Sequence, residues 1–179
     1  LEIGFKNIYG IENNLEYVKK VSEKFKNNEN VSIIHSDSRN GLKEIFNNKN
    51  DNYFVFLDAH GHTIKNDSPV EDEMLFLKSV KDSIKIIIID DFHQIKKKKG
   101  DWQENTGLEN LINLSSNFFG EETKLSEVFY YYGGFKKRNK NSYLIISKKN
   151  KFKNHNILYR LLNDLYIVLL NTVNPKNKI

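Results

Sequence analysis

The sequence predicts an α/β protein built on a doubly wound, mostly parallel β-sheet. Two observations support this fold class. Short apolar runs alternate with amphipathic segments along most of the chain, which is the order expected of parallel strands joined by helices. Acidic residues also follow four of the apolar runs, namely Glu12, Asp37, Asp58 and the pair Asp90-Asp91. Because ligands bind at the carboxyl ends of strands in open α/β sheets, these acids predict one polar crevice.

The predicted strands are short runs rich in apolar residues. The run at 53–57 has no polar alternation, which is typical of strands covered on both faces. The predicted strands lie at residues 6–12, 31–35, 53–57 and 84–89. The last is the strongest, because it contains four consecutive isoleucines.

The predicted helices show apolar residues at helical spacing. In residues 14–27 these are Leu15, Val18, Val21 and Phe25. A later helix has a clear start, with Ser68 as the N-cap, Pro69 at the first helical position and Glu71 at the third. The remaining predicted helices are 40–47 and 106–119, and the helix that starts after Ser68 extends to Lys81.

The remaining segments are predicted to form two loops, a pair of strands and a C-terminal helix. Residues 59–68 and 92–105 are predicted loops, the second of them long and basic. Two strands at 127–132 and 142–147 have no helix between them, so we expect an antiparallel pair at one edge of the sheet. Residues 155–173 predict an amphipathic helix that packs on the domain or on a dimer partner.

Composition narrows the class of protein. A chain of 179 residues fits one α/β domain, predicted at residues 1–150, followed by a helix and tail at 151–179. The absence of cysteine excludes disulfides, a thiolate nucleophile and zinc–cysteine sites. The net charge of +5 is spread over scattered lysines, so neither a nucleic acid nor a membrane is the favoured partner. We expect a cytoplasmic enzyme.

Five segments carry a resemblance to a known family: LEIGFKNIYGIENN, HSDSRNGL, VFLDAHGHT, SPVEDEMLFL and IIIIDDF. Together they make residues 1–147 resemble the class I S-adenosyl-L-methionine-dependent methyltransferases, which have a Rossmann-like fold. The similarity is closest to the small-molecule and sugar O-methyltransferase-like branch. It implies S-adenosyl-L-methionine as the cofactor and a small molecule as the methyl acceptor.

The resemblance implies roles for individual residues. Glu12 stands where the family binds both ribose hydroxyls, a task suited to the two oxygens of a carboxylate. Asn13 lines the same pocket, and Asp37 with Ser38 stands where the family contacts adenine. Asp58 stands beside the transferred methyl group. The alternatives are a surface acid for Glu12 and a turn or helix cap for Asp37 and Ser38.

One part of the family pattern has no counterpart in the sequence. The glycine-rich loop after the first family strand is not present, and residues 1–5 fit the last turn of the following helix. Since a parallel crossover needs about a dozen residues, we expect this loop to lie upstream of Leu1.

The acidic strand ends and nearby histidines suggest the chemistry. Asp58, Asp90 and Asp91 could hold Mg²⁺ or another divalent cation, which would orient the acceptor hydroxyl. In the alternative, Asp91 caps a turn and only Asp58 acts. His60 and His93 are candidate general bases, as is His62, because imidazole titrates near neutral pH.

Aromatic and basic residues suggest how the acceptor is recognised. The lysines at 96–99 would suit an anionic or sugar-linked acceptor, or form a solvated surface. Trp102 is a lid or a loop anchor, and Tyr130–Tyr132 with Phe135 are expected to pack the edge strands.

Two other functions remain open at this stage. One is a truncated, non-catalytic methyltransferase-fold module that binds partners through residues 155–173. The other is a ureohydrolase-like metallohydrolase, suggested by the segment DAHGH, although His62 stands where that family has aspartate.

Overall fold

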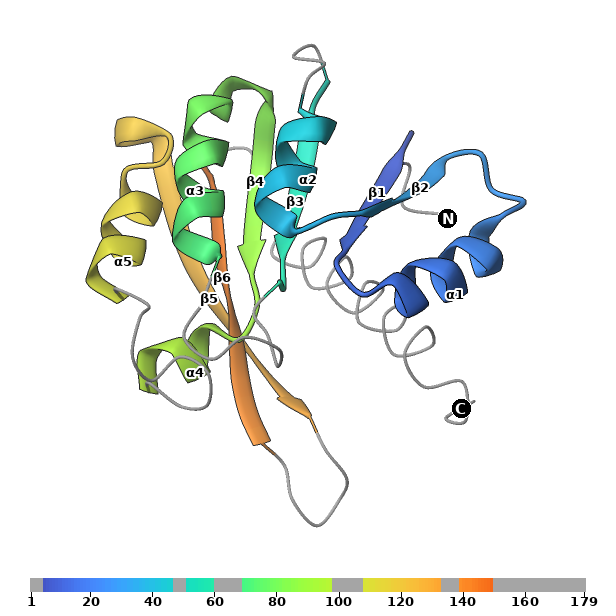
Figure 1. Cartoon of the computed structure of the whole chain (residues 1–179). Coiled ribbons are helices and arrows are strands. Elements are labelled where there is room, and N and C mark those ends of the chain that lie inside the picture. The colour runs from blue at the N-terminus through green and yellow to red at the C-terminus, as the bar shows by residue number, and fades with distance from the viewer. Residues whose placement is uncertain (1–4, 47–50, 60–68, 98–107, 133–138, 150–179) are drawn as a thin grey trace. The chain divides into compact units, whose positions relative to one another are not determined.

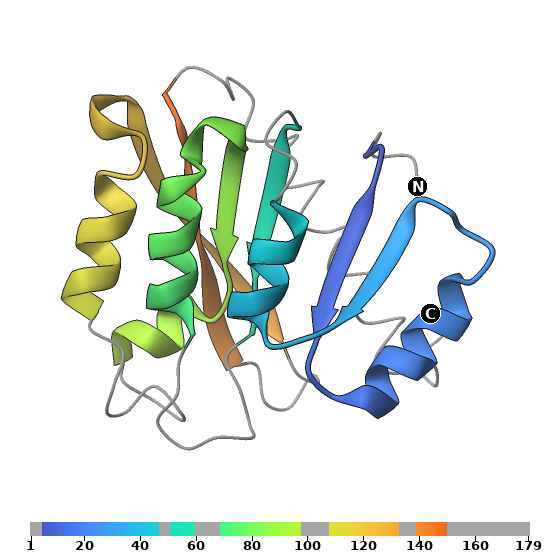
Figure 2. The same cartoon turned by 45° about the horizontal axis from the view of Figure 1, so that its top comes forward.

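The computed structural model describes residues 5–46, 51–59, 69–97, 108–132 and 139–149. The described strands form two sheets. The described residues divide into two compact units, the first ending at Asp37 and the second covering Ser38–Lys149. Figures 1 and 2 show the elements of both units. The predicted helix at 155–173 lies outside the described residues.

The first unit contains a parallel strand pair and one helix. Strand β1 (Ile8–Glu12) pairs in parallel with β2 (Val31–His35), and Glu12 lies opposite His35. Helix α1 (Leu15–Phe25) connects them. The side chain of Asn14 caps this helix by accepting a hydrogen bond from the Glu16 amide, at 2.9 Å.

The second unit contains a four-stranded sheet in the order β3-β4-β6-β5. Strands β3 (Tyr53–Leu57) and β4 (Ile84–Ile89) are parallel, whereas β6 (Asn139–Lys148) runs antiparallel to β4 and to β5 (Thr123–Tyr132). The predicted antiparallel pair is therefore confirmed. Strand β6 lies between β4 and β5, so the hairpin joins the sheet through its second strand.

Helices of the second unit pack on the sheet through apolar residues. They are α2 (Ser38–Ile45), α3 (Val70–Ser79), α4 (Phe92–Lys97) and α5 (Leu108–Ser116), with short 3₁₀ turns at Lys81–Ser83 and Gly120–Glu122. Figures 1 and 2 show α2, α3 and α5 on one face of the sheet. Met74 and Leu77 of α3 and Leu111 of α5 are fully buried.

Strand β4 forms the centre of the core. Its five isoleucines are at most 2% exposed, although their side chains alternate between the two faces of the sheet. Ile145 and Ile146 of β6, which also point to opposite faces, are buried as well. This agrees with the expectation that apolar runs without polar alternation form strands covered on both sides.

Three predicted boundaries need correction. The segment Phe92–Lys97 is helix α4, not part of a loop, because Phe92 and Ile95 lie on one helical face and are buried. Pro69 occupies the N-cap position of α3 and not the first helical position, and Ser68 lies outside the described residues. Helix α2 begins at Ser38, two residues before its predicted start.

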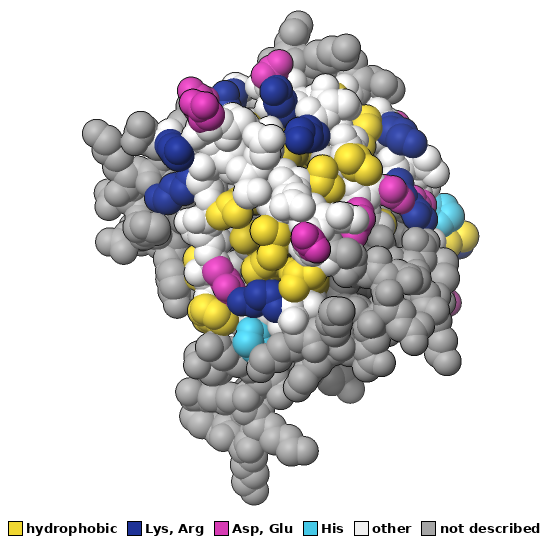
Figure 3. Space-filling view, turned by 90° about the vertical axis from the view of Figure 1, so that its left-hand side faces the viewer, with side chains coloured by type: hydrophobic (Ala, Val, Ile, Leu, Met, Phe, Trp, Pro, Cys, Tyr) yellow, Lys and Arg dark blue, Asp and Glu magenta, His cyan; other side chains and the backbone are white. Residues whose placement is uncertain are grey.

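Some large hydrophobic side chains of the second unit reach the surface. They are Leu75, Ile112, Leu125 and Phe129. On the face shown in Figure 3, hydrophobic side chains lie among interspersed acidic and basic ones. Exposed apolar residues are common on protein surfaces.

We predict that Ile87→Ala lowers the free energy of unfolding by about 2–5 kcal/mol, because truncating a fully buried isoleucine leaves a cavity in the core. Urea unfolding followed by circular dichroism measures this. The control is Leu75→Ala, at a side chain that is 55% exposed, which should change stability by about 0.5 kcal/mol or less. Equal effects of the two variants would contradict the assignment of β4 to the core.

Candidate functional site

The first unit places Glu12, Asn13 and Asp37 at the carboxyl ends of its two strands. The Ser36 amide donates to the Glu12 carbonyl oxygen at 3.1 Å, so the chain leaves β2 beside the end of β1. The His35 Nε2 lies 3.1 Å from the Asn13 carbonyl oxygen and closes the same turn. Glu12, Asn13 and Asp37 therefore lie at one edge of this strand pair.

The carboxylate of Glu12 is already ordered by the protein. Its Oε1 accepts a hydrogen bond from the Asn14 amide at 2.7 Å. Asn14 is in turn the N-cap of α1, so the orientation of Glu12 is tied to the start of that helix. This contact holds the carboxylate in a fixed position.

In the second unit, Asp58 and Asp90 leave neighbouring parallel strands at the same edge. The β3–β4 register pairs Leu57 with Ile89, and each aspartate is the next residue. The amide of Asp90 donates to the Leu57 carbonyl oxygen at 3.0 Å, which extends the pairing by one more bond. Asp58 is exposed, whereas Asp90 and Asp91 are half-buried.

Asp91 begins helix α4. Its carbonyl oxygen accepts hydrogen bonds from the amides of Gln94 and Ile95, at 2.8 and 3.1 Å. Its Oδ1 accepts from the side-chain amides of Gln94, at 2.8 Å, and of Asn141. The backbone takes a positive φ of 52°, which aspartate tolerates better than most residues. Asp91 thus lies directly before α4, where its carbonyl oxygen accepts from the helix and its side chain is held by two side-chain amides.

Asp90 is bound by Tyr130 from the hairpin. The Tyr130 hydroxyl donates to Asp90 Oδ1 at 2.6 Å, and the Asp91 amide donates to the same oxygen at 2.6 Å. Burial raises the pKa of Tyr130 far above its ordinary value, and the charge of Asp90 and the hydrogen bond to it add to the effect. The phenol therefore remains a proton donor to Asp90.

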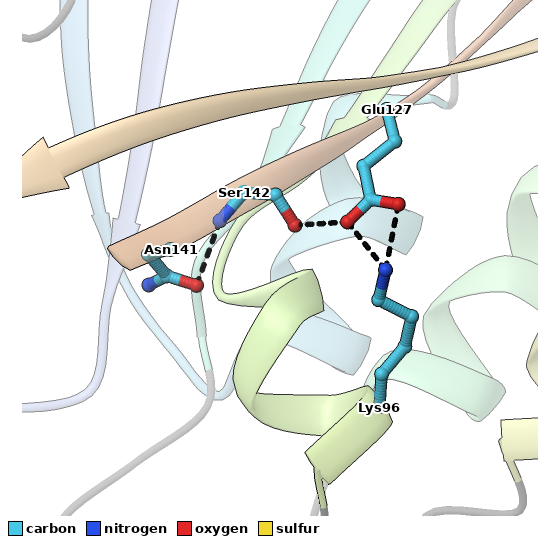
Figure 4. Close-up of polar contacts among 4 residues, drawn as sticks. All are labelled: Lys96, Glu127, Asn141 and Ser142. Atoms are coloured by element: carbon cyan, nitrogen blue, oxygen red, sulfur yellow. Dashed lines mark hydrogen bonds and ion pairs between the residues drawn. The ribbon is translucent and has the colours of Figure 1, made fainter. Parts of the chain in front are cut away.

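A second polar cluster lies beside α4 (Figure 4). Lys96 Nζ donates to both carboxylate oxygens of Glu127, at 2.6 Å each. Ser142 Oγ donates to Glu127 Oε1 at 2.7 Å, and the Ser142 amide donates to Asn141 Oδ1 at 2.9 Å. Through Asn141, this cluster joins the bonds that hold Asp91.

Two aromatic rings lie close to the ammonium group of Lys96. Lys96 Nζ lies 5.2 Å from the ring centroid of Phe92 and 5.6 Å from that of Phe129, within the range of cation–π attraction. His93 meets Phe129 edge-on, with the ring centroids 5.8 Å apart. Lys96 is therefore engaged by Glu127 and two rings, which argues against its predicted role in binding an anionic acceptor.

Burial by itself raises the pKa of Glu127, but the hydrogen bonds from Lys96 and Ser142 and the nearby positive charges outweigh it. The net result is a pKa below the ordinary value of 4.5. Glu127 thus remains ionised at neutral pH and can anchor Lys96.

The remaining predicted residues divide into two groups. His93 lies on α4, in the same unit as Asp58 and the Asp90-Asp91 pair. His60, His62, Trp102 and the lysines at 98 and 99 lie outside the described residues. Among the described residues, Asp58, Asp90 and Asp91 included, no group of three or more His, Cys, Asp or Glu side chains is placed to hold a metal ion.

Sequence reasoning missed the polar roles of three residues. It assigned Tyr130 to packing only, and it did not single out Glu127 or Asn141. The packing role of Tyr130 is confirmed, since its ring stacks on that of Tyr143 with the centroids 4.5 Å apart. Asn141 lies just before the strand predicted at 142–147, and only the register of the hairpin would have paired it with Tyr130.

Comparison with known proteins supports the fold. No family model matches the chain, and no curated protein matches it. Among solved structures, the chain is similar to the crystal structure of a "putative O-methyltransferase from Klebsiella pneumoniae", with a TM-score of 0.52 and 9% sequence identity. The match covers 79% of this chain and 61% of that one, so the chain spans less than two thirds of the length of its structural relative.

The chain has an α/β fold similar to that of this structure. At this level of identity the likeness concerns the fold alone, and it agrees with the Rossmann-like α/β class expected from the sequence. No helix among the described residues is long and apolar enough to cross a membrane.

We predict that the stabilising effect of Glu127 disappears in acid. Because its folded-state pKa lies below the unfolded value, the effect is complete above pH 4.5 and is lost as the pH falls through the folded-state pKa. The stability difference between wild type and Glu127→Gln should therefore shrink as the pH is lowered from 6 to about 3. Urea unfolding at several pH values measures it, with Glu121→Gln, at an exposed position, as the control. A difference that does not change with pH would contradict the Lys96–Glu127 pairing.

Proposed function

We propose that the chain acts in a methyltransferase that transfers the methyl group of S-adenosyl-L-methionine to an oxygen of a small molecule. The observation that carries this proposal is the set of acidic residues at the carboxyl ends of parallel strands, on a fold similar to that of an O-methyltransferase-like structure. Fold alone would not support a function, because one fold serves many chemistries.

In this proposal the first unit contributes to cofactor binding. Glu12 engages the ribose hydroxyls, since a carboxylate can accept two hydrogen bonds from a vicinal diol. Its hydrogen bond from the Asn14 amide fixes its orientation, which lowers the entropy lost on binding. Asn13 lines the same pocket. Asp37, together with Ser38 at the start of α2, contacts the adenine.

The second unit contributes to the transfer. The acceptor oxygen attacks the methyl carbon, a C–O bond forms, the C–S bond breaks, and S-adenosylhomocysteine leaves. The hydroxyl proton passes to a base, for which Asp58 and His60 are the candidates, with His93 as a further one. Asp58 has the support of its position at the end of β3, beside Asp90.

The acceptor is proposed only as a small hydroxyl-bearing molecule. The expectation of an anionic or sugar-linked acceptor rested partly on the lysines at 96–99, and Lys96 is paired with Glu127. Among the described residues, no three His, Cys, Asp or Glu side chains lie close enough together to hold a divalent cation. No step of the proposed reaction is routed through a metal.

We predict that Glu12→Gln weakens the binding of S-adenosylhomocysteine about tenfold or more, because a charged acceptor of two hydrogen bonds becomes a neutral amide. Isothermal titration calorimetry on the whole protein measures the affinity without an acceptor. The control is Glu23→Gln in α1, whose side chain is 71% exposed and pairs with Lys26 one turn along the helix. Absence of binding by the wild type would contradict the proposed function itself.

We predict that Asp58→Asn lowers kcat by about 10²–10⁴-fold, as expected when a general base is neutralised. Release of S-adenosylhomocysteine in the presence of a panel of sugars and phenols measures turnover. Asp82→Asn, at an exposed position of the same unit, should leave turnover unchanged. Full activity of the Asp58→Asn variant would remove this residue from the proposed chemistry, whereas absence of turnover by the wild type would favour a non-catalytic role for the domain.

A further inference from the structure

One pair of side chains on the hairpin reaches both members of the acidic doublet Asp90-Asp91. Tyr130 and Asn141 are direct cross-strand partners in the β5–β6 ladder, so they point to the same face of the sheet. Tyr130 donates to Asp90, and Asn141 donates to Asp91. We propose that Tyr130 and Asn141 are positioning residues that hold the doublet by hydrogen bonds, in the role that a divalent cation would otherwise perform. This inference rests on the proposed function and deepens it.

The bonding of Asp90 supports this role. The Tyr130 hydroxyl and the Asp91 amide both donate to the same oxygen of its side chain, Oδ1. A carboxylate oxygen offers about two lone-pair positions, so the two donors fill Oδ1. A cation that approached this oxygen would have to displace a bound proton donor.

Asp91 likewise accepts two hydrogen bonds at a single carboxylate oxygen. Its Oδ1 accepts from the side-chain amides of Gln94 and Asn141, and its carbonyl oxygen accepts from two amides of α4. Mg²⁺ and Ca²⁺ need oxygen lone pairs that point at the ion. Two side-chain amides in place of an ion therefore fit a hydrogen-bonded doublet better than a pair of metal ligands.

The donors themselves are fixed in place. The Tyr130 ring stacks on Tyr143, with the ring planes 22° apart. Tyr143 in turn meets Phe56 of β3 edge-on, at 6.1 Å between centroids. Asn141 is 1% exposed, and its Oδ1 accepts from the Ser142 amide. Because Asn141 is buried, Tyr130 is half-buried and both lie on paired strands, they hold the doublet in one arrangement.

The consequence concerns the geometry of the reaction. Asp90 is bonded through its amide to the end of β3, directly before Asp58. Fixing the Asp90 carboxylate from the hairpin side therefore fixes its direction relative to the residue proposed to act on the acceptor. Misplacement of a positioning group lowers the rate of transfer even when ligands still bind.

The first test removes the hydroxyl of Tyr130. Tyr130→Phe should lower kcat about 10- to 100-fold, the effect expected for a lost hydrogen bond to a charged group, while KM for S-adenosyl-L-methionine stays unchanged. Tyr53→Phe is the matched control, because that hydroxyl donates to the Ile45 carbonyl oxygen, away from the doublet. Unchanged kcat in Tyr130→Phe, or a parallel loss in Tyr53→Phe, would overturn the positioning role.

The second test uses Mn²⁺ alone as a probe, with the full chain and no cofactor or acceptor. Electron paramagnetic resonance reports free Mn²⁺, and we expect the wild-type chain to leave that signal undiminished at equimolar metal. Stoichiometric Mn²⁺ binding that Asp90→Asn abolishes would overturn the inference. This measurement does not depend on methyl transfer, so it remains decisive even if the chain fails to bind S-adenosylhomocysteine and the proposed function is wrong.

Discussion

The parallel pairing of β3 with β4 is the constraint on which the second unit depends. Its register makes Leu57 and Ile89 partners, so both strands end together. The hydrogen bond from the Asp90 amide to the Leu57 carbonyl oxygen then places Asp58 and Asp90 at one edge. Since the isoleucines of β4 are also the centre of the core, the position of the acids is secured by burial of apolar surface.

The β5–β6 hairpin supplies side-chain hydrogen bonds to Asp90 and Asp91. Its residues lie 40 and 50 positions away from the acids that they contact, as in the bonds from Tyr130 to Asp90 and from Asn141 to Asp91. The Lys96–Glu127 pair ties α4 to the same hairpin. A pair that is partly exposed contributes little stability alone, but here it shares Glu127 with Ser142 and belongs to a network. The acidic doublet is therefore held from β3, from α4 and from β5–β6.

The sequence predicted the core strands well and the polar contacts poorly. The strands at 31–35, 53–57 and 84–89 are confirmed to the residue, because uninterrupted apolar runs leave few alternative boundaries. Helix α4 was predicted as a loop because its lysines hid the short apolar spacing of Phe92 and Ile95. The contacts of Tyr130 depend on the register of the hairpin, and no local pattern reports a register between distant strands.

The most direct test of the account is a crystal structure of the protein with S-adenosylhomocysteine. The account predicts that the sulfur lies beyond the carboxyl ends of β3 and β4, next to the carboxylate of Asp58, with Asp90 still bonded to Tyr130. A ligand bound at the amino ends of these strands, or a cation inserted between Asp90 and Asp91 in place of the Tyr130 and Asn141 contacts, would contradict it.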